Sequence, residues 1–237
     1  MTPPLPDRID EIRARAIALR VFDEPWYAGR VGLPESQAWD HYLVHGWREL
    51  RDPSPLFDVA WYDRGVRHGL SPVARFCDPT TAGIQTPHPM FDPDWYARAY
   101  ARPGLTNRNA WEDFIATGLT NDPGPLFSGN WYLNEYADIA DSGANPWIHF
   151  LEHGGIEGRN PGPLFNSAWY LDTYPGVRAA GINPLTDFLS IGAGLGRNPS
   201  RYFDCAWYAK TYMTTDQNPL VHFVLTGQAA GFNPRPR

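Results

Sequence analysis

The stretch from Asn145 to Tyr170, NPWIHFLEHGGIEGRNPGPLFNSAWY, decides how the rest of the chain is interpreted. It holds a helix-like segment from Pro146 to His153, then a connector rich in glycine and proline, then the start of a new segment at Phe165. Variants of the stretch recur, for example NPLTDFLSIGAGLGRNPSRYFDCAWY from Asn183 to Tyr208 and AWDHYLVHGWRELRDPSPLFDVAWY from Ala38 to Tyr62. The chain is therefore predicted to be an array of one repeated unit.

The repeats are marked by a Trp-Tyr pair that occurs six times, at intervals of 35, 34, 36, 38 and 38 residues. Its tryptophans are Trp26, Trp61, Trp95, Trp131, Trp169 and Trp207. A period in this range is typical of solenoids built from pairs of helices. Because each repeat of such an array buries surface only against its neighbours, the number of repeats matters more than the length of 237 residues.

Each repeat is predicted to open with a helix that follows a phenylalanine and a capping residue. The six pairs are Phe22-Asp23, Phe57-Asp58, Phe91-Asp92, Phe127-Ser128, Phe165-Asn166 and Phe203-Asp204. A side-chain oxygen of Asp, Ser or Asn accepts a backbone N–H at the start of a helix, so these residues are expected N-caps. The phenylalanine and the tyrosine of the Trp-Tyr pair then occupy the two positions of a hydrophobic staple. In the fifth repeat Pro175 is expected to end this helix.

A second helix is predicted where Ser or Asn precedes proline, at Ser71-Pro72, Asn145-Pro146, Asn183-Pro184 and Asn218-Pro219. Its buried face carries two large residues three positions apart. Glycine follows in five repeats and is expected to end the helix in the left-handed conformation, at Gly46, Gly118, Gly154, Gly192 and Gly227. The next connector keeps a nearly constant length, which predicts an ordered connection.

The predicted fold class is all-α: a right-handed solenoid of six helix-turn-helix repeats of about 34–38 residues. The repeats occupy residues 22–237 and begin near residues 22, 57, 91, 127, 165 and 203. Residues 1–21 match none of them. They are expected to form a helix from Asp7 to Arg20 that caps the apolar end of the array. Its apolar face would consist of Ile9, Ile12, Ala16 and Leu19.

The composition narrows the classes of partner. The 22 glycines and 24 prolines indicate short helices and many turns. A net charge of −6, with no run of Lys or Arg, argues against nucleic acid or a membrane surface as a partner. Without the pattern of a signal peptide or a transmembrane helix, the expected location is the cytoplasm. Leaderless export or release inside a particle stays open.

The two cysteines lie far apart in the array. Cys77 falls in the second repeat and Cys205 in the sixth. A disulfide between them would need a closed or strongly curved array, so both are expected to be free, buried thiols.

The repeats share a longer signature, which is matched best from Phe127 to Phe203. The signature is F-D-x-x-W-Y-L-x-x-Y-P, followed by N-P-L-x-H-F-L-x-x-G-x-x-E-G-R-N-P-x-P-L-F. With it the chain resembles a repeat found in and beside bacterial glycosyltransferases and proteins of surface-polysaccharide assembly. The resemblance covers about 215 of the 237 residues and is weakest in the second and third repeats. It implies a non-catalytic module connected with capsule, exopolysaccharide or O-antigen, and it assigns no catalytic residue.

One motif has the spelling of a metal site. His149, Glu152 and His153 form H-x-x-E-H, which on a helix places two histidines four residues apart beside an acid. The position of His149 is occupied in the other repeats by His41, Arg75, Asp113, Asp187 and His222. This variation favours a solvated or capping position, so neither a catalytic metal nor another cofactor is expected. His149 with His153, or His41 with His45, could bind a metal adventitiously.

The candidate ligand-binding residues are one tryptophan and three connector arginines, Trp47, Arg51, Arg159 and Arg197. Such an arginine could grip an anion or a sugar carboxylate. Alternatively, it binds carbonyls at the preceding helix end or stacks on an aromatic ring. Sugar rings also stack on aromatic side chains, but packing between repeats is the favoured explanation of the Trp-Tyr pairs. No packing rule requires Trp47, which makes it the aromatic residue chosen as an exposed contact.

No catalytic set remains once the repeat positions are accounted for. Asp92-Pro-Asp94 spells D-x-D, yet it lies at a predicted N-cap, so no enzymatic activity is expected. The first hypothesis is a module that binds bacterial surface polysaccharide or its assembly machinery. The second is a protein-protein scaffold, or a structural subunit of a larger assembly, without glycan contact. A homo-oligomer is left open in either case.

Overall fold

The regular structure of the chain is helical. The computed structural model describes residues 8–64, 69–78 and 86–236. Over these residues β-pairing is limited to two isolated bridges, Ser54 with Phe57 and Ser200 with Phe203. The prediction of an all-α protein is confirmed. The chain forms two compact units, Met1–Gly118 and Leu119–Arg237, and each is described by itself.

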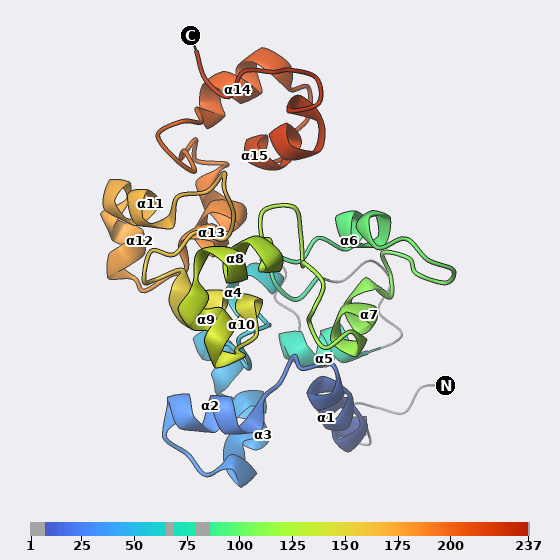
Figure 1. The fold of residues 1–237 in the computed structure, drawn as a ribbon. Helices are drawn as coiled ribbons and strands as arrows, with labels where there is room; N and C mark the ends of the chain where they lie inside the picture. The colour runs from blue at the N-terminus through green and yellow to red at the C-terminus, as the bar shows by residue number, and fades with distance from the viewer. Residues whose placement is uncertain (1–7, 65–68, 79–85, 237) are drawn as a thin grey trace. The chain divides into compact units, whose positions relative to one another are not determined.

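The helices are short and follow the order of the predicted repeats (Figure 1). The first unit contains α1 (Ile9–Ala18), α2 (Glu24–Val31), α3 (Glu35–Val44), the 3₁₀ turn η2 (Gly46–Glu49), α4 (Val59–Tyr62), α5 (Pro72–Cys77), α6 (Pro93–Ala99) and α7 (Ala110–Ala116). The second contains α8 (Gly129–Glu135), α9 (Ala137–Ser142), α10 (Pro146–His149), η3 (Phe150–Gly154), α11 (Ser167–Thr173), α12 (Pro175–Ala179), α13 (Pro184–Asp187), η4 (Phe188–Gly192), α14 (Cys205–Tyr212), α15 (Pro219–His222) and η5 (Phe223–Gly227).

The first helix of every repeat is capped as predicted. The side-chain oxygen of the capping residue accepts the backbone N–H of the following tryptophan at 2.8–3.4 Å. The phenylalanine before the cap packs on the tyrosine of the Trp-Tyr pair, with ring centroids 5.0–5.8 Å apart in all six repeats. Both rings are largely buried, so the staple supplies much of the core of each repeat.

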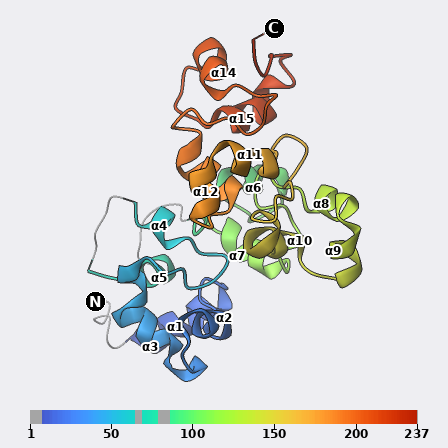
Figure 2. The ribbon, with the colours of Figure 1, turned by 90° about the vertical axis from the view of Figure 1, so that its left-hand side faces the viewer.

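The second helix also begins where the sequence predicts. Asn145 Oδ1 accepts the N–H groups of Trp147 and Ile148 at 3.0 and 3.1 Å, and Ser71 caps α5 through Ala74 N–H at 3.2 Å. Asn183 and Asn218 cap α13 and α15 in the same way. The second helix then packs beside the first, as α14 and α15 do in two views (Figures 1 and 2).

The glycines after the second helix correct one prediction. Gly118 adopts the left-handed conformation, with φ of 70°, but Gly46, Gly154, Gly192 and Gly227 do not. In the last three repeats α10, α13 and α15 continue into one π-helical turn (η3, η4 and η5). There the N–H of Gly155, for example, donates to Phe150 O, five residues back, at 2.9 Å. In these three repeats the left-handed residue comes four positions after the glycine, at Gly158, Gly196 and Gly231. In the first repeat, where the 3₁₀ turn η2 follows α3, it is Leu50, four positions after Gly46.

Glycine is required at Gly46, Gly154, Gly192 and Gly227 because a tyrosine hydroxyl occupies the space that a side chain would need. A Cβ atom at Gly154 would overlap the hydroxyl group of Tyr132. The same overlap recurs for Gly46 with Tyr27, Gly192 with Tyr170 and Gly227 with Tyr208. The first helix of each of these repeats thus approaches the end of the second helix so closely that no side chain fits between them.

The fourth and fifth repeats contain one helix more than predicted. Pro175 does end the preceding helix, because α11 stops at Thr173, but it is also the first residue of α12. Proline is favoured at that position because the N–H it lacks has no partner in the first turn of a helix. In the fourth repeat α9 occupies the equivalent place.

The connectors are ordered because each returns to the start of its own repeat. A connector proline accepts the backbone N–H of the first-helix capping residue at 2.9–3.1 Å in five repeats. The bonds are Asp23 to Pro53, Asp58 to Pro87, Ser128 to Pro161, Asn166 to Pro199 and Asp204 to Pro234. The chain of each of these repeats is thereby closed by one main-chain hydrogen bond.

The N-terminal helix contacts more than the first repeat. Two residues of its predicted apolar face are buried, Ile12 and Ala16. α1 packs on α5 of the second repeat, and the indole Nε1 of Trp111 in the third donates to Leu19 O at 3.0 Å. Asp7, the expected cap, lies outside the described residues. The helix begins at Ile9.

An asparagine links the fourth and fifth repeats. Asn183 is buried, and its Nδ2 donates to Phe150 O at 2.8 Å. Gly155 leaves the room for this amide, since a Cβ there would overlap it. The equivalent residues one repeat later are Ala193 and Asn218. Nδ2 of Asn218 is buried without a hydrogen-bond partner among the described residues.

We therefore expect Gly155→Ala to displace the Asn183 amide and to destabilise the second unit by about 2 kcal/mol, the cost of an unsatisfied buried polar group. Urea unfolding of the full chain, with hydrogen exchange of peptides from residues 119–237, measures the loss. Gly176→Ala in α12 is the matched control, because no atom lies within 4 Å of its added Cβ. Equal stability of the two variants would show that the asparagine contact contributes nothing.

Candidate functional site: the aromatic and arginine positions of the repeats

The tryptophan of each Trp-Tyr pair is half-buried in all six repeats. In four repeats its ring meets the edge of a tyrosine five residues later, at centroid distances of 5.7–6.3 Å and interplanar angles of 86–87°. In the first two repeats an arginine lies over the ring instead, Arg30 at 4.1 Å from Trp26 and Arg64 at 4.9 Å from Trp61. Each indole is therefore held in place while part of it stays accessible to solvent.

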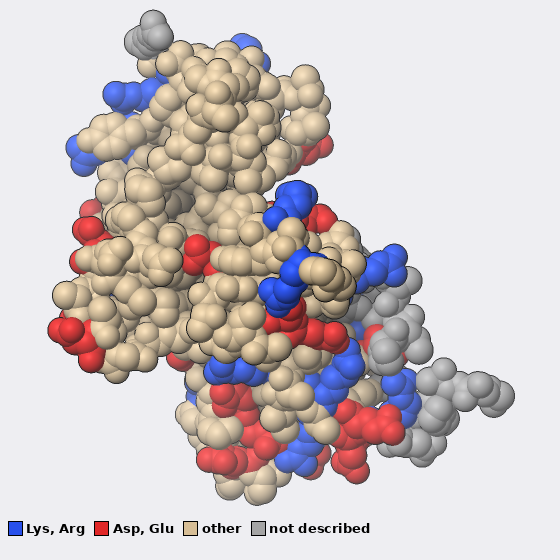
Figure 3. Space-filling model, turned by 45° about the vertical axis from the view of Figure 1, so that its right-hand side comes forward, with Lys and Arg blue, Asp and Glu red and all other residues tan. Residues whose placement is uncertain are grey.

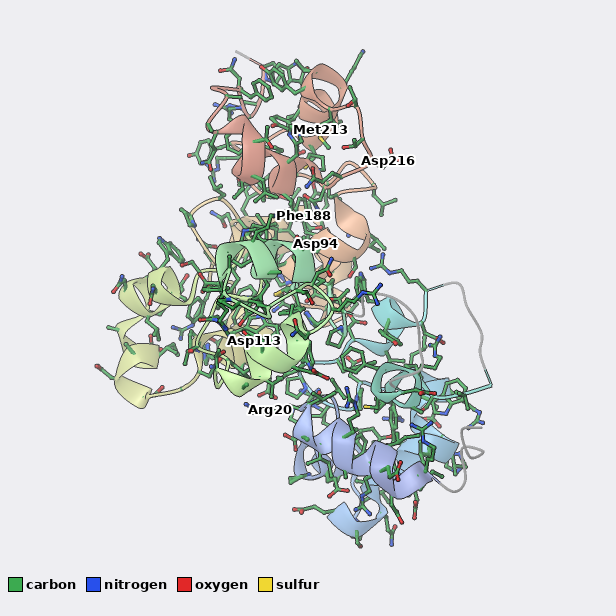
Figure 4. All side chains as sticks on the ribbon, turned by 90° about the vertical axis from the view of Figure 1, so that its right-hand side faces the viewer. Arg20, Asp94, Asp113, Phe188, Met213 and Asp216 are labelled. Carbon is green, nitrogen blue, oxygen red and sulfur yellow. The ribbon has the colours of Figure 1, made fainter. Side chains whose placement is uncertain are left out.

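The tyrosine of the pair belongs to the core and explains the variable histidine position. Its hydroxyl lies 2.9 Å from His Nδ1 in three repeats and donates to an aspartate at 2.8 or 2.6 Å in two others. The partners are His41, His149 and His222, then Asp113 and Asp187; Figure 4 labels Asp113, on α7. The interpretation of this position as solvated or capping was therefore wrong. A buried hydroxyl needs a hydrogen-bond partner, and this position supplies one.

The H-x-x-E-H motif is part of this arrangement. His149 lies against Tyr132, and its ring centroid is 5.8 Å from that of His153. Burial lowers the pKa of His149, which favours a neutral ring beside the phenol. His41 and His45 repeat the geometry at 5.4 Å. The described part of the chain contains no group of three or more His, Cys, Asp or Glu side chains placed to hold a metal ion.

Arg159 and Arg197 are held by carboxylates and stack on tyrosines. Arg159 donates from both terminal nitrogens to Asp138 at 2.9 and 2.8 Å and from Nε to Glu157 at 2.8 Å. Its guanidinium lies 5.0 Å from the ring of Tyr136. Arg197 donates to Asp187 at 2.6 Å and lies 5.3 Å from the ring of Tyr174. Their contacts within the protein match the stacking alternative.

Arg51 differs from these two arginines. Its Nε donates to Glu49 at 2.6 Å, but the structure gives its terminal nitrogens no acceptor within the described residues. Arg51 borders a surface hollow of about 270 Å³ in the first repeat. The other lining residues are Trp26, Tyr27, Arg30, Val31 and Asp52. Aromatic, cationic and carboxyl side chains thus meet in one small depression.

Trp47 lies at a second hollow of the same unit, of about 170 Å³, between α1, α3 and the start of α5. It is half-buried, its Nε1 donates to Leu43 O at 3.0 Å, and Arg48 lies 4.5 Å from its ring. Trp47 was chosen from the sequence as an exposed contact, but its ring is partly covered by these neighbours. The remaining lining is mainly apolar and includes Trp39.

Both cysteines are buried and free, as expected. Burial raises the pKa of each thiol, Cys77 and Cys205, to about 12. Because the thiolate is the nucleophile and the metal ligand, neither side chain is suited to either task near neutral pH.

Sequence analysis found Trp47 and Arg51 but missed the residues that shape the hollow beside Arg51. Val31 and Asp52 drew no notice because neither is a conspicuous residue type. A signal was present: Val31 stands five residues after Trp26, where four of the other repeats carry the tyrosines Tyr100, Tyr136, Tyr174 and Tyr212.

Comparison of the chain with protein-family models, with curated proteins and with solved structures gives no match. Among the described residues, no helix has both the length and the apolar character needed to cross a membrane.

Proposed function

We propose that this chain is a non-catalytic module that binds bacterial surface polysaccharide (capsule, exopolysaccharide or O-antigen) or the machinery that assembles it. The single observation that carries the proposal is the half-buried tryptophan in the same position of all six repeats. A polysaccharide repeats its sugar units, and sugar rings pack on flat aromatic side chains. A repeated, fixed aromatic position suits such a polymer better than it suits a single small ligand.

The array itself belongs to the proposal. The six repeats would stack as a right-handed solenoid behind the N-terminal helix, which would place the tryptophans at regular intervals. Closure of five repeats by their own connectors supports such stacking, because each repeat then behaves as one block. The Asn183 contact to Phe150 O supports it for the fourth and fifth repeats.

Binding of polysaccharides to the full chain by calorimetry tests this function. The panel should hold an acidic capsular polysaccharide, a neutral exopolysaccharide and an O-antigen polysaccharide. We expect at least one to bind, and Trp131→Ala and Trp169→Ala each to weaken binding by roughly tenfold, about 1.4 kcal/mol. Trp47→Ala should weaken it as well if the second hollow contributes.

Ile148→Ala is a control for a change in half-buried apolar surface at α10 without loss of a tryptophan. Circular dichroism of each variant checks that the fold is retained. The proposal fails if no polysaccharide of the panel binds, or if the tryptophan variants bind as tightly as the parent chain.

A protein-protein scaffold is the second candidate, and exposed apolar side chains favour it. In the fifth repeat Ile191 is 53% exposed, Leu195 is 65% exposed, and Tyr202, just before the sixth, is 62% exposed. On the face seen in Figure 3, the part formed by α14 and α15, at the top, carries few charged side chains. Stable capture of a protein partner that Leu195→Asp abolishes, together with no glycan binding, would support this function instead.

A further inference from the structure

The hollow beside Arg51 lies where other repeats hold part of their own chain. In the fourth repeat Tyr136, five residues after Trp131, meets that indole edge-on at 6.3 Å. The Tyr136 hydroxyl accepts the backbone N–H of Asn160 at 2.7 Å. The fifth repeat repeats both contacts with Tyr174, whose hydroxyl accepts Asn198 N–H at 2.8 Å. A hydroxylated six-membered ring thus fills this place.

The first repeat has no such ring. Val31 takes the place of Tyr136, and Asp52 takes the place of Asn160. Over the described residues the backbone N–H of Asp52 has no hydrogen-bond acceptor, whereas the Asn160 N–H has one. Val31 and Asp52 both border the hollow. The first repeat therefore offers a hollow without the tyrosine ring, bordered by Arg30 over Trp26 and by an N–H donor that has no acceptor among the described residues.

The first repeat also lacks the carboxylate that binds the connector arginine in the fourth repeat. In the fourth repeat the two terminal nitrogens of Arg159 bind both oxygens of Asp138, while Nε binds Glu157. Arg51 binds Glu49 through Nε in the same way. The residue equivalent to Asp138 is Leu33, which has no carboxylate. The paired terminal nitrogens of Arg51 are the donors that a carboxylate binds best.

We propose that the first repeat binds an acidic sugar residue, a uronate, in the hollow between Trp26, Val31, Arg51 and Asp52. The pyranose ring takes the place of the missing phenol, one hydroxyl accepts the Asp52 N–H, and the carboxylate pairs with the terminal nitrogens of Arg51. This inference rests on the proposed function and narrows its ligand to polysaccharides that contain carboxylated sugars.

The lining of the hollow favours a sugar over a phenolic acid, which would also supply a ring, a hydroxyl and a carboxylate. Three of the six lining residues have ionisable side chains, Arg30, Arg51 and Asp52. A sugar carries several hydroxyls that can bond to these side chains, whereas a phenol has one. The volume of about 270 Å³ suits a single ring rather than a larger ligand.

Titration of the full chain with methyl β-D-glucuronide, followed by the resonance of the Trp26 indole and by calorimetry, tests the inference. A ligand of this size is expected to bind with a dissociation constant on the order of 1 mM. Methyl β-D-glucoside, which lacks the carboxylate, should bind at least tenfold more weakly. Val31→Tyr, which supplies the phenol that other repeats carry, should abolish glucuronide binding while the chain stays folded.

Arg51→Gln is the second variant, and because Arg51 is exposed the change leaves the core intact. It should weaken glucuronide binding at least tenfold and leave glucoside binding unchanged. Arg178→Gln, at an exposed arginine paired with Asp172, is the matched control and should bind glucuronide as the parent does.

Three outcomes would overturn the inference. One is that no glucuronide binding is detected at a ligand concentration about 20-fold above the expected dissociation constant of ~1 mM. The others are that Val31→Tyr binds glucuronide as the parent does, or that 4-hydroxybenzoate binds and the sugar does not. Its failure is distinguishable from that of the proposed function. If polysaccharide binds through Trp131 and Trp169 while Val31→Tyr has no effect, the module binds glycans but the first repeat is not a uronate site.

Discussion

Replacing Gly154 with alanine is expected to destabilise the second unit by about 3 kcal/mol. The added Cβ would overlap the Tyr132 hydroxyl, which would have to leave its place beside His149. The cost combines overpacking with the loss of a buried hydrogen bond, each of about 1–3 kcal/mol. Urea unfolding of the full chain, with hydrogen exchange of residues 119–237, measures it.

A double-mutant cycle isolates the cause. Tyr132→Phe removes the hydroxyl, so the nearest contacts of the new Cβ become His149 Nδ1 at 3.2 Å and the ring carbon of residue 132 at 3.3 Å, which small shifts relieve. In the Tyr132→Phe background, Gly154→Ala should cost no more than about 1 kcal/mol, which gives a coupling energy of about 2 kcal/mol. Additive effects of the two changes would mean that glycine is needed here for some other reason.

The contribution of His88 to the stability of the first unit is expected to fall as the pH falls from about 6.5 to about 4. This side chain is buried, and its Nδ1 accepts the backbone N–H of Met90 at 3.2 Å. Burial lowers the pKa of His88 to about 4, although Asp58 opposes the shift. In the unfolded chain the pKa is near 6.5.

The direction follows from which state binds the proton. Between pH 6.5 and 4 the unfolded chain protonates His88 and the folded chain does not, so stability is complete above pH 6.5 and is lost below it. The shift corresponds to at most about 3 kcal/mol. Urea unfolding at pH 7.5 and 4.5, followed by hydrogen exchange of residues 86–118, measures the difference in the free energy of unfolding of the first unit.

His88→Ser is the natural variant for this test, because Ser54 and Ser200 occupy the equivalent turns. Ser54 Oγ accepts the N–H of Leu56 at 3.2 Å, as His88 Nδ1 accepts that of Met90. The variant should lose most of the difference between the two pH values, whatever its stability at pH 7.5. His153→Ser, at an exposed histidine, should keep it. Burial raises the pKa of Asp52 in the same unit to about 7, which opposes the trend, so the comparison of the parent with His88→Ser is the test. The same pH dependence in both chains would contradict the assignment to His88.

The helix starts could be predicted because their signals are local. Asn145-Pro146 and Phe165-Asn166 carry the cap and its neighbours within a few residues, and both act as expected. The role of Gly154 could not be predicted in the same way. Glycine after a helix suggests a left-handed end, whereas the true requirement comes from Tyr132, a residue of another helix.

The sequence did indicate that the buried tyrosines need a hydrogen-bond partner, but only through comparison of all six repeats. Tyrosine, never phenylalanine, follows the tryptophan in all six repeats, which indicates that the hydroxyl is used. Its partner varies between histidine and aspartate, as at His149 and Asp187, so the position seemed unconstrained in the sequence. Its common property is a side chain able to bond a phenol.

The candidate site was predicted in part. Arg51 and Trp47 were chosen from the sequence, and each borders a hollow of the first unit. Arg159 was chosen for the same reason as Arg51, but its terminal nitrogens already hold Asp138. The difference between the two arginines lies in Val31 and Leu33, which stand where the fourth repeat carries Tyr136 and Asp138, and it has physical meaning only because these residues contact Arg159 and the connector in the folded repeat.

The bond from each connector proline back to its own capping residue affects how the chain can change in length. Deletion of residues 127–164 would remove Ser128 together with Pro161, its partner, and would leave the bond from Asn166 to Pro199 untouched. A cut in mid-repeat would separate the two partners. Gene duplication or loss is therefore tolerated most easily in steps of one whole repeat, so relatives of this chain should differ in how many repeats they carry more readily than in the length of any one.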